Sequence, residues 1–166
     1  MHRLILMRHA EAELAAPGSG DRERTLSPRG QAEAAAMARM LVENRLRPDV
    51  ALVSSAVRTR QTWEKIEEAI GDAEVRILPE LYNASADTLR RYVEDAEEEA
   101  GCLLVMAHNP GVHQLAVDLL NECAASPAVL DRLSSGFPTA AAAVFEVDQA
   151  GRCAYDGFLI PRGAEA

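Results

Sequence analysis

The chain has 166 residues, which is long enough to bury a hydrophobic core, and we expect a single domain that spans residues 1–166. Its 26 Asp and Glu against 17 Lys and Arg give a net charge of −9, which disfavours binding to nucleic acid and to anionic membranes. Any anionic substrate must therefore be held by arginines that are gathered locally.

Cysteine content and hydropathy restrict the cellular setting. The three cysteines lack a Cys-x-x-Cys pair, so the sequence indicates neither a disulfide framework nor a zinc site. The apolar run near the N-terminus is too short for a secretory signal, and no later run approaches the length of a membrane span. We therefore expect a protein of the reducing cytoplasm that makes no membrane contact.

The first predicted element is a strand over residues 4–7, four apolar residues that stop abruptly at Arg8 and His9. A polar loop marked by glycine and proline follows over residues 15–25. An apolar run that ends on two cationic or titratable side chains is typical of a buried strand that delivers them to the edge of a sheet. Open α/β folds place their ligand sites at that edge.

Helical and strand periodicities alternate along the rest of the chain. Several expected helices begin at a capping residue or a first-turn proline, as at Ser27 and Pro28, and several stop at a glycine, as at Gly71. The expected elements are a helix over 28–44, a strand over 50–54, a helix over 58–70, a strand over 75–78, a helix capped by residue 85 or 87 and ending at 100, a strand over 102–107 and a helix from 110 through 120.

The chain is expected to close with a β-hairpin formed by residues 141–147 and 153–160 around a turn at 148–151. The alanines at 140–143 are equally compatible with the start of a helix. Strands that alternate with helices predict right-handed crossovers and a mostly parallel sheet. The fold class is therefore α/β, a single three-layer domain with helices on both faces of the sheet.

Three of the predicted strands each end at a cationic or titratable side chain. In chain order, these side chains are Arg8, His9, Arg58 and His108. One histidine at a strand end is most simply a structural residue, but four such groups at one edge are difficult to explain by packing. Phosphoryl transfer needs fixed donors aimed at three equatorial oxygens. Arg8, Arg58 and His108 suit that task, which leaves His9 to attack phosphorus in line.

These segments resemble a known family. The matching segments are Met7-Arg8-His9-Ala10, residues 54–62 and Ala107-His108-Asn109. They are similar to the histidine phosphatase superfamily, the phosphoglycerate mutase-like group, and within it to the SixA-type phosphohistidine phosphatases. The resemblance covers essentially the whole chain. It implies a phosphoglycerate mutase-like fold, transient phosphorylation of His9, and a phosphate pocket formed by Arg8, Arg58 and His108.

The resemblance implies two further roles. Glu80 matches in order the superfamily's proton donor, and Arg24 resembles an arginine that precedes the first helix in SixA-like chains. We therefore expect Glu80 to be catalytic and Arg24 to bind substrate, although a solvated loop residue is the simpler explanation for each. Tyr82 could line the mouth of the pocket or merely pack.

The sequence also departs from the family pattern. Ala10 stands where much of the superfamily has glycine, and Ser55 replaces a frequent proline, but neither change removes a donor. Larger members carry a long insertion before the second histidine, whereas one predicted helix separates Glu80 from His108 here. The resulting open pocket suits a phosphorylated protein better than a small sugar acid.

We therefore expect a metal-independent phosphatase that acts through a phosphohistidine intermediate and needs no cofactor. Glu11 and Glu13 lie near His9, but no second histidine or acidic cluster completes a metal site. The expected substrate is phosphohistidine on a signalling or phosphotransfer protein. The alternatives are a small phosphorylated substrate, used by a phosphomonoesterase or a mutase, and a non-catalytic module that only binds phosphoryl groups.

Overall fold

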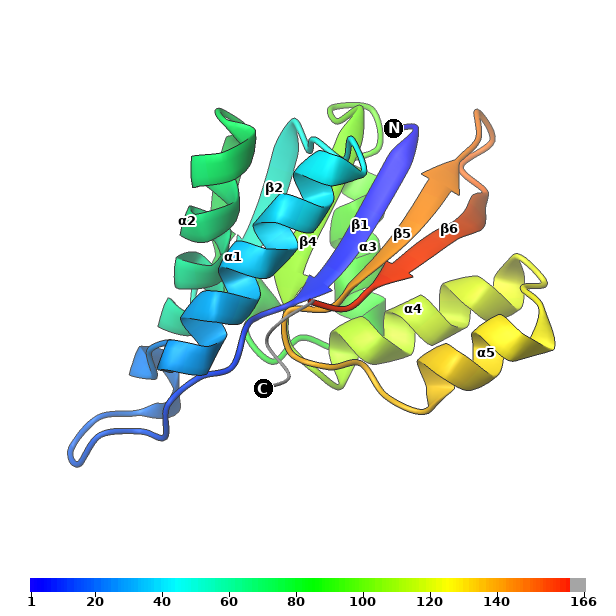
Figure 1. Cartoon of the computed structure of the whole chain (residues 1–166). Helices are drawn as coiled ribbons and strands as arrows, with labels where there is room; N and C mark the ends of the chain where they lie inside the picture. The colour runs from blue at the N-terminus through cyan, green and yellow to red at the C-terminus, as the bar shows by residue number, and fades with distance from the viewer. Residues whose placement is uncertain (162–166) are drawn as a thin grey trace.

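A six-stranded sheet forms the middle layer of the molecule (Figure 1). The computed structural model describes residues 1–161, and residues 162–166 of the expected domain lie outside the described residues. The strands are β1 (Arg3–Arg8), β2 (Val50–Ser54), β3 (Glu74–Leu78), β4 (Cys102–Ala107), β5 (Ala142–Val147) and β6 (Cys153–Leu159). Their order across the sheet is β3-β2-β4-β1-β5-β6.

The sheet is mixed, with a parallel centre and an antiparallel edge. The strands β3, β2, β4 and β1 pair in parallel, β5 is antiparallel to β1, and β6 is antiparallel to β5. The predicted closing hairpin is therefore confirmed, and the alternative of a helix at the alanines is wrong. All four alanines are buried; Ala142 and Ala143 begin β5, which lies between β1 and β6, and Ala140 and Ala141 precede it.

Helices cover both faces of the sheet (Figure 1). The helices α1 (Pro28–Glu43) and α2 (Val57–Ile70) lie on one face, and α3 (Ala86–Asp95), α4 (Gly111–Glu122) and α5 (Pro127–Ser134) lie on the other. Two short 3₁₀ turns, η1 (Asp21–Glu23) and η2 (Pro79–Leu81), precede α1 and α3. This is the three-layer α/β arrangement that the sequence predicts.

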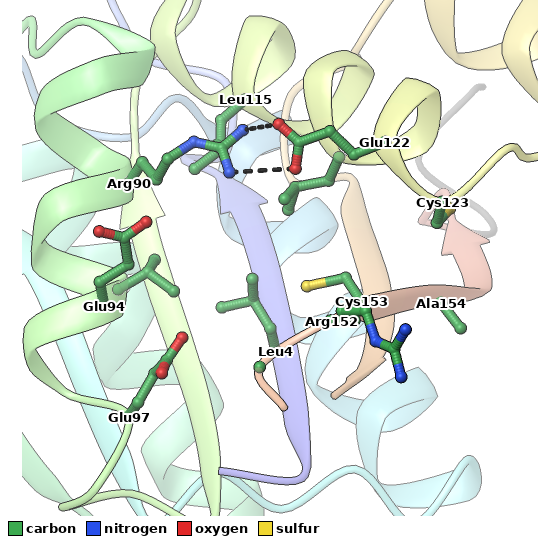
Figure 2. A pocket seen from close by; sticks show the side chains of 13 residues that line it. Leu4, Arg90, Glu94, Glu97, Leu115, Glu122, Cys123, Arg152, Cys153 and Ala154 are labelled. Carbon is green, nitrogen blue, oxygen red and sulfur yellow. Dashed lines mark hydrogen bonds and ion pairs between the residues drawn. The ribbon is translucent and has the colours of Figure 1, made fainter. Parts of the chain in front are cut away.

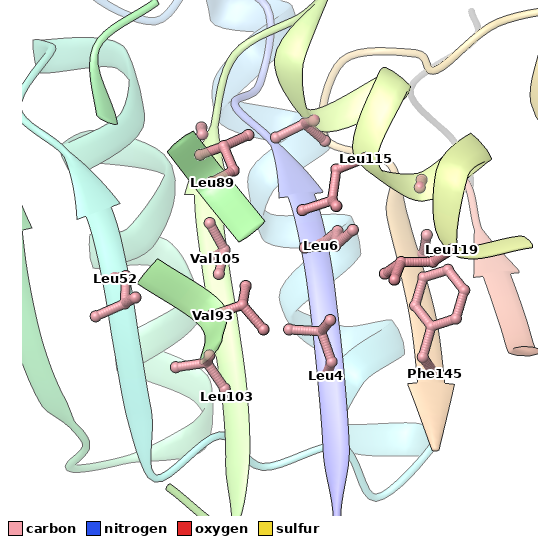
Figure 3. Close-up of a cluster of buried hydrophobic side chains, with 14 of the residues drawn as sticks. Leu4, Leu6, Leu52, Leu89, Val93, Leu103, Val105, Leu115, Leu119 and Phe145 are labelled. Carbon is pink, nitrogen blue, oxygen red and sulfur yellow. The ribbon is translucent and has the colours of Figure 1, made fainter. Parts of the chain in front are cut away.

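The alternation of side chains along β1 explains why two helical layers are needed. Leu4 and Leu6 pack beneath α3 and α4 (Figure 3), whereas Ile5 and Met7 pack beneath α1 and α2. Successive side chains of a strand point to opposite faces, so an unbroken apolar run must be covered on both sides. The central strand therefore belongs to both hydrophobic cores and is firmly placed.

Two helical predictions need correction, and one helix was not predicted. α3 ends at Asp95, five residues before residue 100, because the acidic run 94–99 is unfavourable at a helix C-terminus. Asn109 does not cap α4, since its side chain donates to the carbonyl of Phe137 instead. α5 was not predicted, although Ser126 and Pro127 repeat the cap-then-proline order that starts α1.

None of the helices within residues 1–161 has both the length and the apolar character that crossing a membrane requires.

Candidate active site

A polar cavity of about 360 Å³ lies at the carboxyl ends of the central strands. The neighbouring strands β2, β4 and β1 end at Ser54, Ala107 and Arg8. Their ends therefore bring together residues that are far apart in the sequence. The lining residues are Arg8, His9, Glu11, Ala12, Arg24, Arg58, Asn83, His108, Asn109 and Thr139.

His9 lies in this cavity as a neutral imidazole with a defined tautomer. The residue is 8% exposed, and its Nδ1 lies 2.8 Å from the carbonyl oxygen of Ala10. A carbonyl only accepts, so Nδ1 carries the proton and Nε2 keeps its lone pair. Burial is the largest cause that lowers the pKa of His9 to about 3. The hydrogen bond to the Ala10 carbonyl opposes this shift, whereas the nearby charges of Arg58 and Arg8 add to it. The unprotonated Nε2 is therefore a competent nucleophile at neutral pH.

The tautomer of His9 depends on the position of the Ala10 carbonyl, which neighbouring elements hold in place. The Ala10 amide donates to the Thr62 hydroxyl of α2 over 3.0 Å. The side chain of Thr62 in turn donates to the Arg58 carbonyl. Helix α2 thus carries Arg58 and also supports the peptide that orients His9.

His108 is a second neutral histidine, with its ring centroid 5.3 Å from that of His9. Its Nδ1 lies 3.3 Å from Nη2 of Arg58, and a guanidinium only donates, so Nδ1 is the acceptor. Nε2 therefore donates to the Ser54 hydroxyl over 2.7 Å. Burial lowers the pKa of His108 to about 4, and the Arg58 charge adds to that shift. In this arrangement both ring nitrogens are engaged within the protein.

Two arginines that line the cavity each carry a buried donor without a partner. Arg8 donates through Nη1 to the Phe137 carbonyl over 3.1 Å, yet its Nε is buried without a partner. Arg58 is 4% exposed and its Nε also lacks a partner. A buried donor on a cation is costly when it has no acceptor. An oxyanion in the cavity is the chemical group that would satisfy both.

Arg58 also contacts the η1 turn. Its Nη1 donates to the Asp21 carbonyl over 2.9 Å, and its Nη2 donates to the Asp21 carboxylate over 3.1 Å. Tyr82 donates its hydroxyl to the same carboxylate, and the ring of Tyr82 meets His108 edge-on, with centroids 5.4 Å apart. Sequence reasoning did not find Asp21, because a single acid in a Gly/Pro-rich loop carries no pattern.

The buried Glu33 of α1 is a second residue that sequence reasoning missed. Its carboxylate accepts from the Glu11 amide over 2.8 Å and from the Thr139 hydroxyl over 2.9 Å. A Cβ at Gly30 would lie 1.9 Å from the Glu11 carbonyl oxygen, so only glycine lets α1 approach the segment after His9. The signal was present, since Glu33 shares a helix face with Gly30 and Met37, which are both buried.

The two residues predicted from the resemblance alone have different placements. Arg24 lines the cavity, but its Nε donates to the Glu13 carbonyl over 2.7 Å and its Nη1 to Asp21 over 3.1 Å. Glu80 is exposed on η2 and is not among the cavity-lining residues. The catalytic role of Glu80 and the binding role of Arg24 stay predictions.

Within residues 1–161, no group of three or more His, Cys, Asp or Glu side chains is arranged to hold a metal ion. The donors of the cavity are cationic guanidinium groups and neutral imidazoles, which suit an anion.

A second cavity, of about 300 Å³, lies beneath α3 and α4 near the opposite end of β1 (Figure 2). Leu4, Leu115 and Leu119 form part of its wall. At its mouth, Arg90 and Glu122 form a two-pronged ion pair with N–O distances of 3.1 and 2.6 Å. None of the predicted site residues lines it.

Comparisons with known proteins agree with this geometry. Residues 4–124 match the model of the histidine phosphatase superfamily (branch 1). An uncharacterized protein of Mycobacterium tuberculosis is 34% identical over 162 residues, which cover 94% of this chain and all of the relative. A solved structure from Agrobacterium tumefaciens, assigned as a phosphohistidine phosphatase SixA, has a TM-score of 0.86 and 32% identity and covers 96% of this chain and 98% of that one.

A structure of the protein histidine phosphatase SixA complexed with tungstate has a TM-score of 0.78 and 26% identity, with 96% of this chain and 97% of that chain covered. The matching fold and family model account for the mixed sheet and for the order of the site segments along the chain. The chain therefore belongs to the histidine phosphatase superfamily, within its SixA-type group, and is a phosphatase.

Proposed function

We propose that this phosphatase removes phosphate from phosphohistidine on a partner protein, without a metal ion, by way of a phosphorylated His9. The observation that carries the proposal is the pairing of a neutral His9, whose Nε2 is unprotonated, with two arginines whose buried Nε atoms lack partners. A nucleophile and an oxyanion-binding group thus line one cavity.

In the first step, the guanidinium groups of Arg8 and Arg58 hold the phosphoryl oxygens. Nε2 of His9 attacks phosphorus, and the bond from phosphorus to the leaving nitrogen breaks. The leaving nitrogen keeps the bonding electron pair and departs as part of a neutral imidazole whose other ring nitrogen carries the proton. In the second step, water attacks phosphorus, the bond from Nε2 to phosphorus breaks, and inorganic phosphate leaves. The dianionic phosphoryl group raises the proton affinity of nearby His108, so Nδ1 can become a donor when the Arg58 contact is given up.

The site favours a leaving group that needs little acid catalysis. Glu80 is exposed and stands outside the cavity lining, so it is poorly placed to protonate an alkoxide leaving group. The imidazole of phosphohistidine leaves with a proton that it already carries. Only η2 and α3 lie between β3 and β4, so no long insertion covers the site, and a protein surface can approach.

The SixA structure that contains tungstate supports an oxyanion in the equivalent fold, because tungstate and phosphate are both tetrahedral oxyanions. The three cysteines are all free thiols, which suits the proposed cytoplasmic location.

The decisive experiment traps the intermediate. The protein is mixed with a ³²P-labelled phosphohistidine protein, or with an aryl phosphate, in the presence of a chelator, and is quenched in alkali. We expect label on His9 that survives base and is lost in acid, as a phosphoramidate should be. His9→Gln should lose the label, whereas the matched control His2→Gln, at an exposed histidine outside the cavity, should keep it.

Label on a serine, or label that persists in His9→Gln, would refute the mechanism. Activity that disappears with chelator and returns with a divalent cation would refute the metal-independent step. Fast turnover of small phosphate esters, without turnover of phosphohistidine, would overturn the substrate class and leave the His9 mechanism standing.

A further inference from the structure

The η1 turn places a carboxylate directly on the central arginine of the site. Asp21 accepts from Nη2 of Arg58 over 3.1 Å and from Nη1 of Arg24 over 3.1 Å. The hydroxyl of Tyr82 donates to the same oxygen that Arg58 contacts. These bonds, with the Tyr82 bond as the largest cause, hold the pKa of Asp21 well below its usual range. Asp21 is therefore an anion at every working pH.

The two members of this ion pair differ sharply in burial. The Arg58 side chain is 5% exposed, whereas that of Asp21 is 48% exposed. Residues 13–23 around Asp21 are all exposed, and Figure 1 shows this segment projecting away from the sheet beyond the end of β1. The arginine is thus a fixed part of the site, and its counter-ion approaches from the solvent side.

Other contacts hold Arg58 even without the carboxylate. Its Nη1 donates to the backbone carbonyl of Asp21 over 2.9 Å, and its Nη2 lies 3.3 Å from Nδ1 of His108. A guanidinium has five N–H bonds, and three of them are engaged by these two contacts and the carboxylate. The carboxylate therefore consumes a donor and neutralises a charge at the place where a phosphoryl group needs both.

We propose that Asp21 is a competing counter-ion, a residue that tunes anion affinity by acting through Arg58. The incoming phosphoryl group takes over the Nη2 donor from Asp21, and Asp21 returns to Arg58 as inorganic phosphate leaves. The competition weakens the binding of free phosphate, so the product dissociates readily and inhibits the enzyme only weakly. This inference rests on the proposed function, because it assumes that Arg58 binds the phosphoryl group.

Tyr82 serves as the attachment point for the counter-ion. Its hydroxyl bonds to Asp21, and the guanidinium of Arg22, the next residue of η1, lies 4.5 Å from the centroid of its ring. Removing the hydroxyl should therefore loosen the carboxylate without removing its charge. We therefore expect Tyr82→Phe to raise the affinity for phosphate, as Asp21→Asn does, but by a smaller factor.

The test compares Asp21→Asn, Tyr82→Phe and the control Glu23→Gln in steady-state hydrolysis of an aryl phosphate, with inorganic phosphate as inhibitor. Glu23 lies in the same exposed turn and makes no bond to Arg58. We expect the inhibition constant for phosphate and the KM to fall about tenfold in Asp21→Asn, because one partly screened negative charge is removed. We expect a fall of about twofold to threefold in Tyr82→Phe.

In Asp21→Asn, the fall in KM should exceed any change in kcat. A loss of kcat with an unchanged or raised phosphate inhibition constant would mean that the carboxylate only positions Arg58, and the inference would be wrong. If Glu23→Gln lowers KM and the phosphate inhibition constant as much as Asp21→Asn does, the cause is net charge, and the inference about Asp21 is also wrong. If the wild-type protein neither forms phosphohistidine nor is inhibited by phosphate, the proposed function itself fails, and the wild-type measurements alone reveal this.

Discussion

The two cavities described above have similar volumes, about 360 and 300 Å³, but different linings. The cavity at the carboxyl ends of the strands holds buried arginine nitrogens that lack partners. In the cavity beneath α3 and α4, Arg90 and Glu122 satisfy one another, and the wall includes Leu4 and Leu119 (Figure 2). Unmet hydrogen-bonding capacity, rather than volume, therefore distinguishes the candidate active site from the second cavity.

The same contrast separates activity from stability. Side chains in the polar cavity are costly to bury and are expected to act on substrate. The leucines that line the cavity beneath α3 and α4, which we call the apolar cavity, belong to the hydrophobic core and are expected to act on the free energy of unfolding. Each of the following changes challenges that division.

The largest effect is expected for Arg58→Lys. A lysine replaces the fixed fork of donors with a point charge, and loss of one such donor costs about 100- to 1,000-fold in kcat. Arg90→Lys, at the mouth of the apolar cavity, is the matched control and should leave aryl phosphate hydrolysis unchanged. Both variants should be compared with wild type by steady-state kinetics and thermal unfolding. A folded Arg58→Lys within a few-fold of wild type would remove Arg58 from the mechanism.

Glu80→Gln tests how far the polar site extends. If Glu80 protonates an alkoxide, hydrolysis of alkyl phosphates should fall about 100-fold, the lower end of what a general acid contributes. Hydrolysis of phosphohistidine and of an activated aryl phosphate should barely change, because neither leaving group needs that proton. Rates on the three substrates check this directly. Equal losses on all three would show that Glu80 supports the site's structure instead.

Leu119→Ala probes the apolar cavity from α4. Leu119 is buried in the core beneath the helices (Figure 3), and its truncation enlarges an existing hollow. We expect the free energy of unfolding to fall by about 2–3 kcal/mol, with kcat/KM within about twofold of wild type. Urea unfolding and aryl phosphate kinetics measure the two quantities. A large loss of activity in a folded variant would show that the two cavities are coupled.

The last expected effect is a pH dependence of stability that originates in the polar cavity. The folded pKa values are about 3 for His9 and about 4 for His108, below the unfolded value of about 6.5. The unfolded chain therefore binds more protons between pH 4 and 6.5. The free energy of unfolding is therefore highest above pH 6.5, where both histidines are neutral in the folded and the unfolded chain. It decreases as the pH falls below 6.5, because the unfolded chain takes up protons first.

Each histidine contributes a slope of up to about 1.4 kcal/mol per pH unit in that range. Urea unfolding at several pH values should show a shallower slope for His9→Gln than for wild type. Leu119→Ala should lower the whole curve without changing its slope. An unchanged slope in His9→Gln would mean that His9 is not buried in its neutral form.

The strand-end residues of the site could be predicted from the sequence, because an apolar run and the residue that ends it are local features. The joining of Arg58 to His108 follows from parallel strands with neighbouring carboxyl ends. The contact between Asp21 and Tyr82 could not be predicted, because it joins two irregular segments that lack periodicity. The early end of α3 was foreseeable in part, since the acidic run opposes the helix dipole.

The double burial of β1 also has a consequence for dynamics. The strand contributes to both cores and is paired with β4 and β5 along its length, so separating it would open most of the molecule. Amide hydrogens of β1 should therefore exchange with solvent only through global unfolding, while those of the exposed segment 13–20 exchange by local fluctuation. His9 follows the strand that we expect to exchange most slowly, and Asp21 follows a segment that we expect to exchange fast. The proposed nucleophile is therefore held rigidly, while the proposed counter-ion of Arg58 can move.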